Sequence, residues 1–384
     1  MQVTRNPSLG RLVAVIGAIV FVDTMFYAAI APLLPALTRQ LSLSKLSAGV
    51  MTAGYPLGTL VGSLPGGMLA ARAGPRFTVC SGLALLAAST LAFAFLGNVA
   101  LLDLARFAEG VGGACSWAGG LAWIVNEAPV ERRGTLIGSA LGAAIGGALF
   151  GPIIGTIATA TGRAAAFSGV VVIAGWLIVL ARRVPSRHVS SSQGMRAVRV
   201  ALGHSGVRLG MWLVALPAVA SGALNVLGPL RLHRFGAAAA AIGATYLIAA
   251  GLEAVVSPLI GRLSDRRGRL LPLRFGLAVT VVFLACFTLP QQAWLLALVV
   301  VGIASSLGAF WAPAMAMLSD AAEASGLNQG LAAALMNLAW AGGQIAGSGG
   351  GGAVAKSTGD AAPMLAAAVL CGLTLALLSR SGSS

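Results

Sequence analysis

The sequence predicts an all-α polytopic membrane protein with twelve transmembrane helices in two pseudo-symmetric six-helix bundles. First, 58% of the residues are hydrophobic and only 9% are charged, whereas a soluble domain averages about 25% charged residues. Second, a spanning helix needs about 20 apolar residues, and twelve such segments with short loops fill the 384 residues. Third, one loop motif occurs twice, about half the chain apart.

The repeated loop begins and ends with glycine. Gly67 and Gly74 match Gly261 and Gly268 at one offset of 194 residues. Arginine is costly in hydrocarbon, so each copy is expected to form a tight cytosolic turn between two membrane helices. A repeat of half the chain length is typical of secondary transporters built from paired halves. Charged positions of the two copies include Arg72, Arg76, Asp265, Arg266 and Arg269.

The apolar segments divide the chain into two halves around a polar, basic stretch. We expect an N-terminal bundle at 1–181, a cytosolic linker at 182–208 and a C-terminal bundle at 209–384. The predicted helices are 12–35, 47–68, 77–97, 100–124, 134–158, 164–181, 209–230, 241–261, 273–289, 293–318, 327–353 and 361–379.

The charge distribution predicts the topology. The net charge is +15, and most basic residues fall in the linker, the termini and the loops that an inside N-terminus places in the cytosol. This positive-inside bias predicts that both termini are cytosolic. Nucleic-acid binding would need a basic face with groove-reading or stacking partners, so it is excluded as a function. The excess of arginine over lysine is typical of a GC-rich bacterial genome, and we expect the cytoplasmic membrane of a bacterium as the location.

Nothing in the sequence predicts a metal, a cofactor or enzymatic chemistry. All four cysteines fall in apolar segments and the three histidines fall in or near loops, so they lack metal-site spacing. No nucleophile–base pair stands out either. We therefore expect a non-enzymatic protein without cofactors, working as a monomer in the bilayer on a small molecule and protons.

The segment 134–158 carries a seam of glycines around a proline. Glycines four residues apart line one helix face and let another backbone approach closely, and proline bends the helix. Two interpretations are open, a packing seam or a flexible gate. We expect this seam to form part of the moving contact with its counterpart in the second half, Gly343, Gly347 and Gly351. The seam residues are Gly138, Gly147, Gly151, Pro152 and Gly155.

These motifs together resemble the major facilitator superfamily, and within it the twelve-helix drug:proton antiporters. The loop 67–76 resembles motif A of that superfamily, Arg106 with Glu109 and Gly110 resembles motif B, and 138–155 matches the antiporter motif C. Asp23, with Pro32 and Pro35 after it, resembles the acidic first-helix motif. The resemblance implies the two-bundle fold, alternating access and proton-coupled export.

Three positions depart from the family pattern. Ala71 stands where motif A usually has an aspartate that joins a charge network between the bundles, although the second copy keeps Asp265. Glu109 stands where motif B usually has glutamine. Thr156 stands where motif C often has a second glycine.

Four charged residues fall well inside predicted membrane helices, whereas Asp103 and Arg274 lie near helix ends. A charge at this depth is costly and marks function. A carboxylate in a dry site holds its proton more tightly than one in water, and a nearby arginine opposes this effect. Exchange between wet and dry states could therefore couple proton uptake to substrate release. A structural ion pair is the alternative for each. The candidate proton-coupling residues are Asp23, Glu253, Arg106 and Glu109.

Aromatic and amide side chains in the cavity-lining helices are candidate substrate ligands. Aromatic faces suit flat apolar or cationic molecules, whereas packing between helices is the alternative role for each. The candidates are Phe26, Tyr27, Tyr55, Trp117, Asn225, Tyr246, Trp311, Asn337, Trp340 and Gln344.

The sequence leaves three functions open. The first is a proton-coupled exporter of small amphipathic organic compounds, including drugs. The second is a transporter of the same fold for one metabolite, such as a sugar, an amino acid or a natural product. The third is a membrane sensor that has lost transport, for which Ala71 is the only support.

Overall fold

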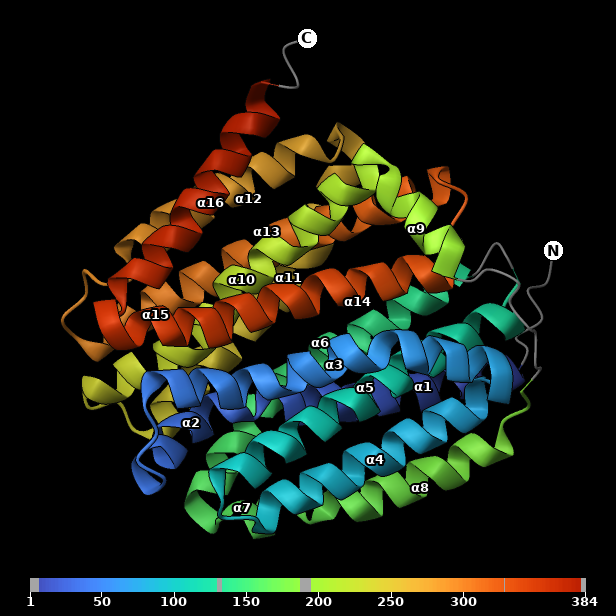
Figure 1. Ribbon diagram of the computed structural model, residues 1–384, viewed down its shortest axis with the longest axis horizontal. Helices are drawn as coiled ribbons and strands as arrows, with labels where there is room; N and C mark the ends of the chain where they lie inside the picture. The colour runs from blue at the N-terminus through green and yellow to red at the C-terminus, as the bar shows by residue number, and fades with distance from the viewer. Residues whose placement is uncertain (1–6, 130–132, 187–194, 328, 381–384) are drawn as a thin grey trace.

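The computed structural model describes residues 7–129, 133–186, 195–327 and 329–380, and all secondary structure in these ranges is helical. Figure 1 shows two groups of helices, with the N-terminal half (blue to green) packed along the C-terminal half (yellow to red). The central contact brings α3 beside α14, two helices from opposite ends of the chain.

The first half contains six membrane-length segments in eight helices. They are α1 (Pro7–Ala28), α2 (Ile30–Gln40), α3 (Lys45–Ala73), α4 (Pro75–Phe95), α5 (Val99–Glu127), α6 (Arg133–Thr161), α7 (Arg163–Phe167) and α8 (Gly169–Arg183). The segment made of α1 and α2 breaks at Ala29. Pro32 explains this break, because proline disrupts the helical bond to the residue four positions earlier.

The second half repeats this plan after a short helix in the linker. Its elements are α9 (Met195–Gly203), α10 (Ser205–Arg234), α11 (Ala239–Arg267), α12 (Leu270–Cys286), α13 (Ala293–Ala324), α14 (Gln329–Ile345), η2 (Ala346–Gly350), α15 (Gly351–Thr358) and α16 (Ala361–Arg380). All twelve predicted segments coincide with helical segments, and most extend a few residues beyond their predicted ends. The π-helical turn η2 is not among the elements predicted from the sequence.

The outer surface is apolar, as a bilayer requires. Eight helices in the described residues are long and apolar enough to cross a membrane. Large apolar side chains such as Phe95, Val172, Trp176 and Leu377 are more than half exposed on them. A soluble protein rarely exposes so many such side chains, so the chain is a polytopic membrane protein.

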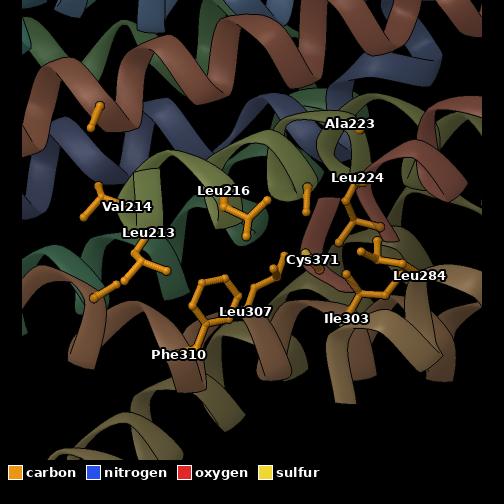
Figure 2. Packing of buried hydrophobic residues seen from close by; sticks show 14 of the residues in the cluster. Leu213, Val214, Leu216, Ala223, Leu224, Leu284, Ile303, Leu307, Phe310 and Cys371 are labelled. Atoms are coloured by element: carbon orange, nitrogen blue, oxygen red, sulfur yellow. The ribbon is translucent and has the colours of Figure 1, made fainter. Parts of the chain in front are cut away.

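Inside each half, the helices pack around a continuous apolar core. In the second half this core joins α10, α12, α13 and α16, and Figure 2 shows Leu213 and Leu216 facing Leu307 and Phe310 across it. Each of these four side chains is at most 4% exposed. The same cluster also includes Leu34 and Ala48 of the first half, so apolar packing continues across the contact between the halves.

Glycines let the helices of the first half approach closely. Gly54, Gly58, Gly62 and Gly66 recur every fourth residue on α3 and face the backbone of α5. A methyl group at Gly58 would overlap the carbonyl of Phe107. Spacing of four places small residues on one helix face, so α3 and α5 are held backbone to backbone.

The glycine seam of α6 packs within its own bundle. Gly147 lies against the carbonyl of Phe21 and Gly155 against that of Ala29, so the partner of the seam is the α1–α2 segment. In the second half, Gly343 and Gly347 lie in the same way against α10. The expectation that the two seams meet is therefore wrong, because each seam seals its own bundle. The described contact of α6 with the other half is with α11, where Gly243 approaches Thr156.

The repeated loops form the predicted tight turns. Gly74 has φ 92° and Gly268 has φ 82°, a region that L side chains rarely adopt. Arg76 donates hydrogen bonds to the carbonyls of Arg182 (3.1 Å) and Val184 (3.3 Å) at the end of α8. Arg269 forms an ion pair with Asp320 on α13 at 2.5 Å.

Other positions of the two motifs carry fewer contacts. Gly67 and Gly138 have no atoms close to the position of a side chain. Arg72 is exposed and has no hydrogen bond or ion pair within the described ranges. The side chains of Asp265 and Arg266 lie outside the described part of the structure, and so do the surroundings of Gly261.

Candidate transport site

The centre of the candidate site is the carboxylate of Asp23, which is completely buried on α1. The hydroxyl of Tyr55 on α3 donates to Oδ1 at 2.7 Å, and the indole Nε1 of Trp117 on α5 donates to Oδ2 at 3.0 Å. No cation contacts it among the described residues. Two neutral donors offset part of the cost of burying a carboxylate, and they fix its orientation between three helices.

Gly113 provides the space for this carboxylate. A methyl group at this position of α5 would overlap the Tyr55 hydroxyl and would lie 2.6 Å from Oδ1 of Asp23. Gly113 is absent from the site residues predicted from the sequence. The internal repeat could have indicated Gly113, because Gly308 lies 195 residues further on. Gly308 also faces an intramembrane carboxylate, that of Glu253.

A buried ion pair lies beside the Asp23 cluster. Nη1 of Arg106 donates to Oε2 of Glu109 at 2.6 Å, and both side chains are 3% exposed. Thr90 on α4, a residue that the sequence did not single out, donates to Oε1 of Glu109 at 3.2 Å. The Arg106 guanidinium lies 5.4 Å from the centroid of the Tyr55 ring. Tyr55 is therefore in contact with both Arg106 and Asp23.

The guanidinium of Arg106 is only partly satisfied. Its Nε and Nη2 atoms are buried and have no hydrogen-bond partner in the described part of the chain. Buried donors without partners cost free energy. Arg106 therefore has two unused hydrogen-bond donors next to Tyr55, whose hydroxyl binds Asp23.

Aromatic rings connect this cluster to the second half. The Tyr27 ring lies 4.8 Å from the Tyr55 ring and 5.6 Å from the Trp340 ring on α14, the latter edge to face. The side chain of Asn225 on α10 interacts with the Tyr27 hydroxyl. Tyr27 is therefore the point at which the acidic cluster of the first bundle meets side chains of the second.

Gln344 on α14 is buried against α10 in the second bundle. Its Nε2 donates to Ser221 Oγ on α10 at 2.9 Å, while its buried Oε1 has no partner among the described residues. Asn337 is half-buried on the same helix, α14. Both amides lie on the helix that carries Trp340.

Three candidate ligands pack elsewhere. Phe26 is in the core of the first bundle, with its ring 5.7 Å from that of Phe167. Tyr246 donates to the carbonyl of Leu224 at 3.0 Å, so its hydroxyl joins α11 to α10. Trp311 packs against the core of the second bundle. Their contacts are those of packing residues.

Glu253 is a second intramembrane carboxylate, separate from the Asp23 cluster. It is half-buried on α11, and a methyl group at Gly308 on α13 would lie 2.5 Å from its Cγ. It has no hydrogen bond or ion pair with any residue that the structure describes. The two candidate carboxylates thus differ, since Asp23 is held by two donors and Glu253 by none.

The described residues offer no metal-binding cluster, since no three His, Cys, Asp or Glu side chains gather there. The four cysteines are not linked to one another.

Replacing Gly113 with alanine is expected to abolish coupled exchange while the protein still folds. The added methyl must displace the Tyr55 hydroxyl or Asp23, and overpacking of this kind costs about 1–3 kcal/mol. The measurement is substrate-driven proton flux in vesicles. Gly142→Ala is the matched control, because Gly142 is an exposed helical glycine with open space around it. Wild-type flux in Gly113→Ala would show that the tight fit at Asp23 is dispensable.

Two groups of membrane helices with a buried carboxylate close to their contact are typical of membrane transporters. The family model described as Major Facilitator Superfamily matches residues 16–326 and, in a second match, residues 211–382. The chain therefore belongs to the major facilitator superfamily, as the repeated loop and glycine motifs predicted. The comparison with curated proteins gives no match.

Two solved structures show the same fold. One is a bacterial homolog of the human lysosomal transporter Spinster, in an inward-facing and unoccupied conformation. It aligns with a TM-score of 0.76 at 16% identity over 98% of each chain. The other is a D-xylose-proton symporter, with a TM-score of 0.75 at 17% identity over 96% of each chain. At this identity the likeness establishes the architecture, and substrate must be argued from the site.

Proposed function

We propose that the protein exports small amphipathic organic compounds, multidrug-type, in exchange for protons. The observation that carries this proposal is the buried Asp23 carboxylate, which has no cationic partner among the described residues and binds Tyr55 and Trp117. The rings of Tyr27 and Trp340 extend this aromatic group toward the second bundle. A carboxylate next to aromatic faces suits an organic cation, because ring faces and the acid both attract positive charge.

Proton exchange follows from competition for Asp23. A proton that neutralises the carboxylate removes its attraction for a cationic substrate, and a bound substrate opposes protonation. Arg106 supports the exchange by moving between Glu109 and Asp23, since it holds unused donors beside Tyr55. Glu253 serves as a second acid in the other bundle, and Glu253→Gln tests this role in the same flux assay.

Transport proceeds by alternating access. The bundles 1–181 and 209–384 rock against each other around the Tyr27–Trp340 contact, joined by the linker 182–208. Each bundle moves largely as a body, because the glycine seams of α6 and α14 pack against helices of their own bundle. The chain works as a monomer in a bacterial cytoplasmic membrane with both termini in the cytosol, and it performs no covalent chemistry.

The test is drug-driven proton release from inverted membrane vesicles with an acidic interior. A panel of cationic dyes and drugs is added one at a time, and the pH gradient is followed by fluorescence. We expect several unrelated amphipathic cations to dissipate the gradient, and vesicles without the protein serve as the control. If a single sugar, amino acid or other metabolite alone moves protons, the protein is a transporter for that compound. If no compound does, the exporter proposal fails.

A further inference from the structure

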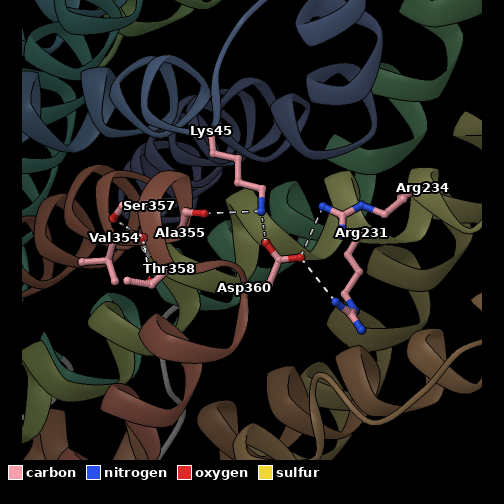
Figure 3. A network of polar contacts seen from close by, with 8 residues as sticks. All are labelled: Lys45, Arg231, Arg234, Val354, Ala355, Ser357, Thr358 and Asp360. Atoms are coloured by element: carbon pink, nitrogen blue, oxygen red, sulfur yellow. Dashed lines mark hydrogen bonds and ion pairs between the residues drawn. The ribbon is translucent and has the colours of Figure 1, made fainter.

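A buried acid at one end of the molecule binds basic residues from both bundles. Asp360 lies just before α16 and its side chain is 4% exposed. Lys45 at the start of α3 contacts its Oδ1 at 2.5 Å, while Arg231 and Arg234 at the end of α10 contact its Oδ2 at 3.3 and 3.6 Å. Figure 3 shows the carboxylate between Lys45 of the first bundle and the two arginines of the second.

Lys45 is the member of this network that crosses between the bundles. Its Nζ also lies 3.5 Å from the carbonyl of Ala355 on α15, a second contact with the other bundle. Arg231 is anchored in its own bundle, since it donates to the Thr288 carbonyl at 2.9 Å. Removing Lys45 therefore breaks the link between bundles but leaves Asp360 with two cations.

The backbones of the two bundles touch directly beneath the ion pair. A methyl group at Gly49 of α3 would overlap the carbonyl of Ser348, and one at Gly352 of α15 would lie 2.6 Å from the carbonyl of Lys45. No side chain separates the helices at this crossing. Small residues at a helix interface allow such a close approach of the two backbones.

The helix on the far side of the crossing is interrupted. Residues 346–350 form the π-helical turn η2 between α14 and α15, in a run that contains Gly347, Gly349 and Gly350. A π-helical turn often marks a functional site, and glycine imposes the least restriction on backbone change. This turn lies between the Trp340 contact on α14 and the Gly352 crossing on α15.

We propose that Lys45 and Asp360 form a latch that holds this end of the transport pathway closed. With the topology proposed above, it is the outer end. The ion pair and the Gly49–Gly352 crossing stabilise the closed state together, and opening breaks both while η2 bends. The inference concerns the conformational equilibrium and holds whichever compound is transported.

The test measures access to a residue behind the latch. Ala53 lies on α3 two turns after Lys45 and faces η2 of the other bundle. A methyl group placed at Gly349 would lie 3.7 Å from the Cβ of Ala53. In full-length protein with the four native cysteines replaced, Ala53→Cys is labelled from outside intact cells with a membrane-impermeant maleimide. No substrate is added, so a failure of the exporter proposal leaves the result interpretable.

Lys45→Ala is expected to raise the labelling rate about fivefold or more, the lower end of typical couplings between states. Lys356→Ala is the matched control, because it removes the other lysine of the chain, an exposed one on α15. Gly49→Ala, which wedges the crossing apart, should act in the same direction. A second readout is the distance between spin labels at Gln40→Cys and Ser357→Cys. This distance should be longer in Lys45→Ala and Gly49→Ala than in the parent protein. Labelling of both variants at the parent rate, with unchanged distances, would overturn the proposal.

Discussion

Replacing Asp23 with asparagine is expected to reduce drug-driven proton release to the level of vesicles without the protein. Asparagine keeps the shape of the side chain and still accepts a hydrogen bond from Tyr55 or Trp117, so the loss in stability is limited to about 1 kcal/mol, the worth of one hydrogen bond. It cannot carry the exchangeable proton or balance a cation. The measurement is the fluorescence assay of the pH gradient, with thermal unfolding in detergent as the check on folding.

Asp103→Asn is the matched control for this experiment. Asp103 is also an acid within a membrane helix of the first bundle, on α5, but it is half-buried and lies outside the Asp23 cluster. We expect near wild-type proton release from this variant. Unchanged release in Asp23→Asn would contradict the assigned role and would leave Glu109 and Glu253 as the candidate acids for coupling.

The fold could be predicted because membrane constraints act on every segment. Twelve apolar stretches and a duplicated loop with glycine at fixed positions specify the helices and their halves, and the structure has helices at all twelve. Breaks and ends were less predictable. The helix α1 ends at Ala28 within an uninterrupted apolar stretch. The turn η2 lies in a segment that has glycines on both sides.

The candidate site could be predicted only in part, because composition does not reveal helix facing. Asp23, Tyr27, Tyr55, Trp117 and Trp340 were all selected from the sequence, and the structure brings them together. Phe26, adjacent to Tyr27, points into the bundle core because neighbours on a helix differ by about 100° in direction.

The contacts between distant segments gave no local signal. Lys45 and Asp360 are 315 residues apart and each looks like an ordinary loop charge. Gly113 is one of many glycines on a glycine-rich helix, and only its position opposite Asp23 gives it a role. Such pairs become visible when the helices are placed in space.

Breaking the Arg106–Glu109 pair from one side is expected to destabilise the protein strongly. Both side chains are 3% exposed, so Arg106→Met leaves a buried carboxylate without its cation. Removing one partner of a buried pair costs about 3–5 kcal/mol, whereas replacing both partners with apolar residues is often neutral. We therefore expect a large fall in the unfolding temperature for Arg106→Met and for Glu109→Met, and a substantial recovery in the double variant.

The double variant also separates structure from transport. Independent contributions would make its unfolding temperature fall by the sum of the two single losses, and that result would contradict a coupled pair. With folding recovered, proton flux in the double variant reports on Arg106 and Glu109 together. Loss of exchange in a stable protein would show that the pair takes part in proton coupling, because its structural role has then been replaced by apolar side chains. Retained exchange would reduce the pair to a packing device within the first bundle.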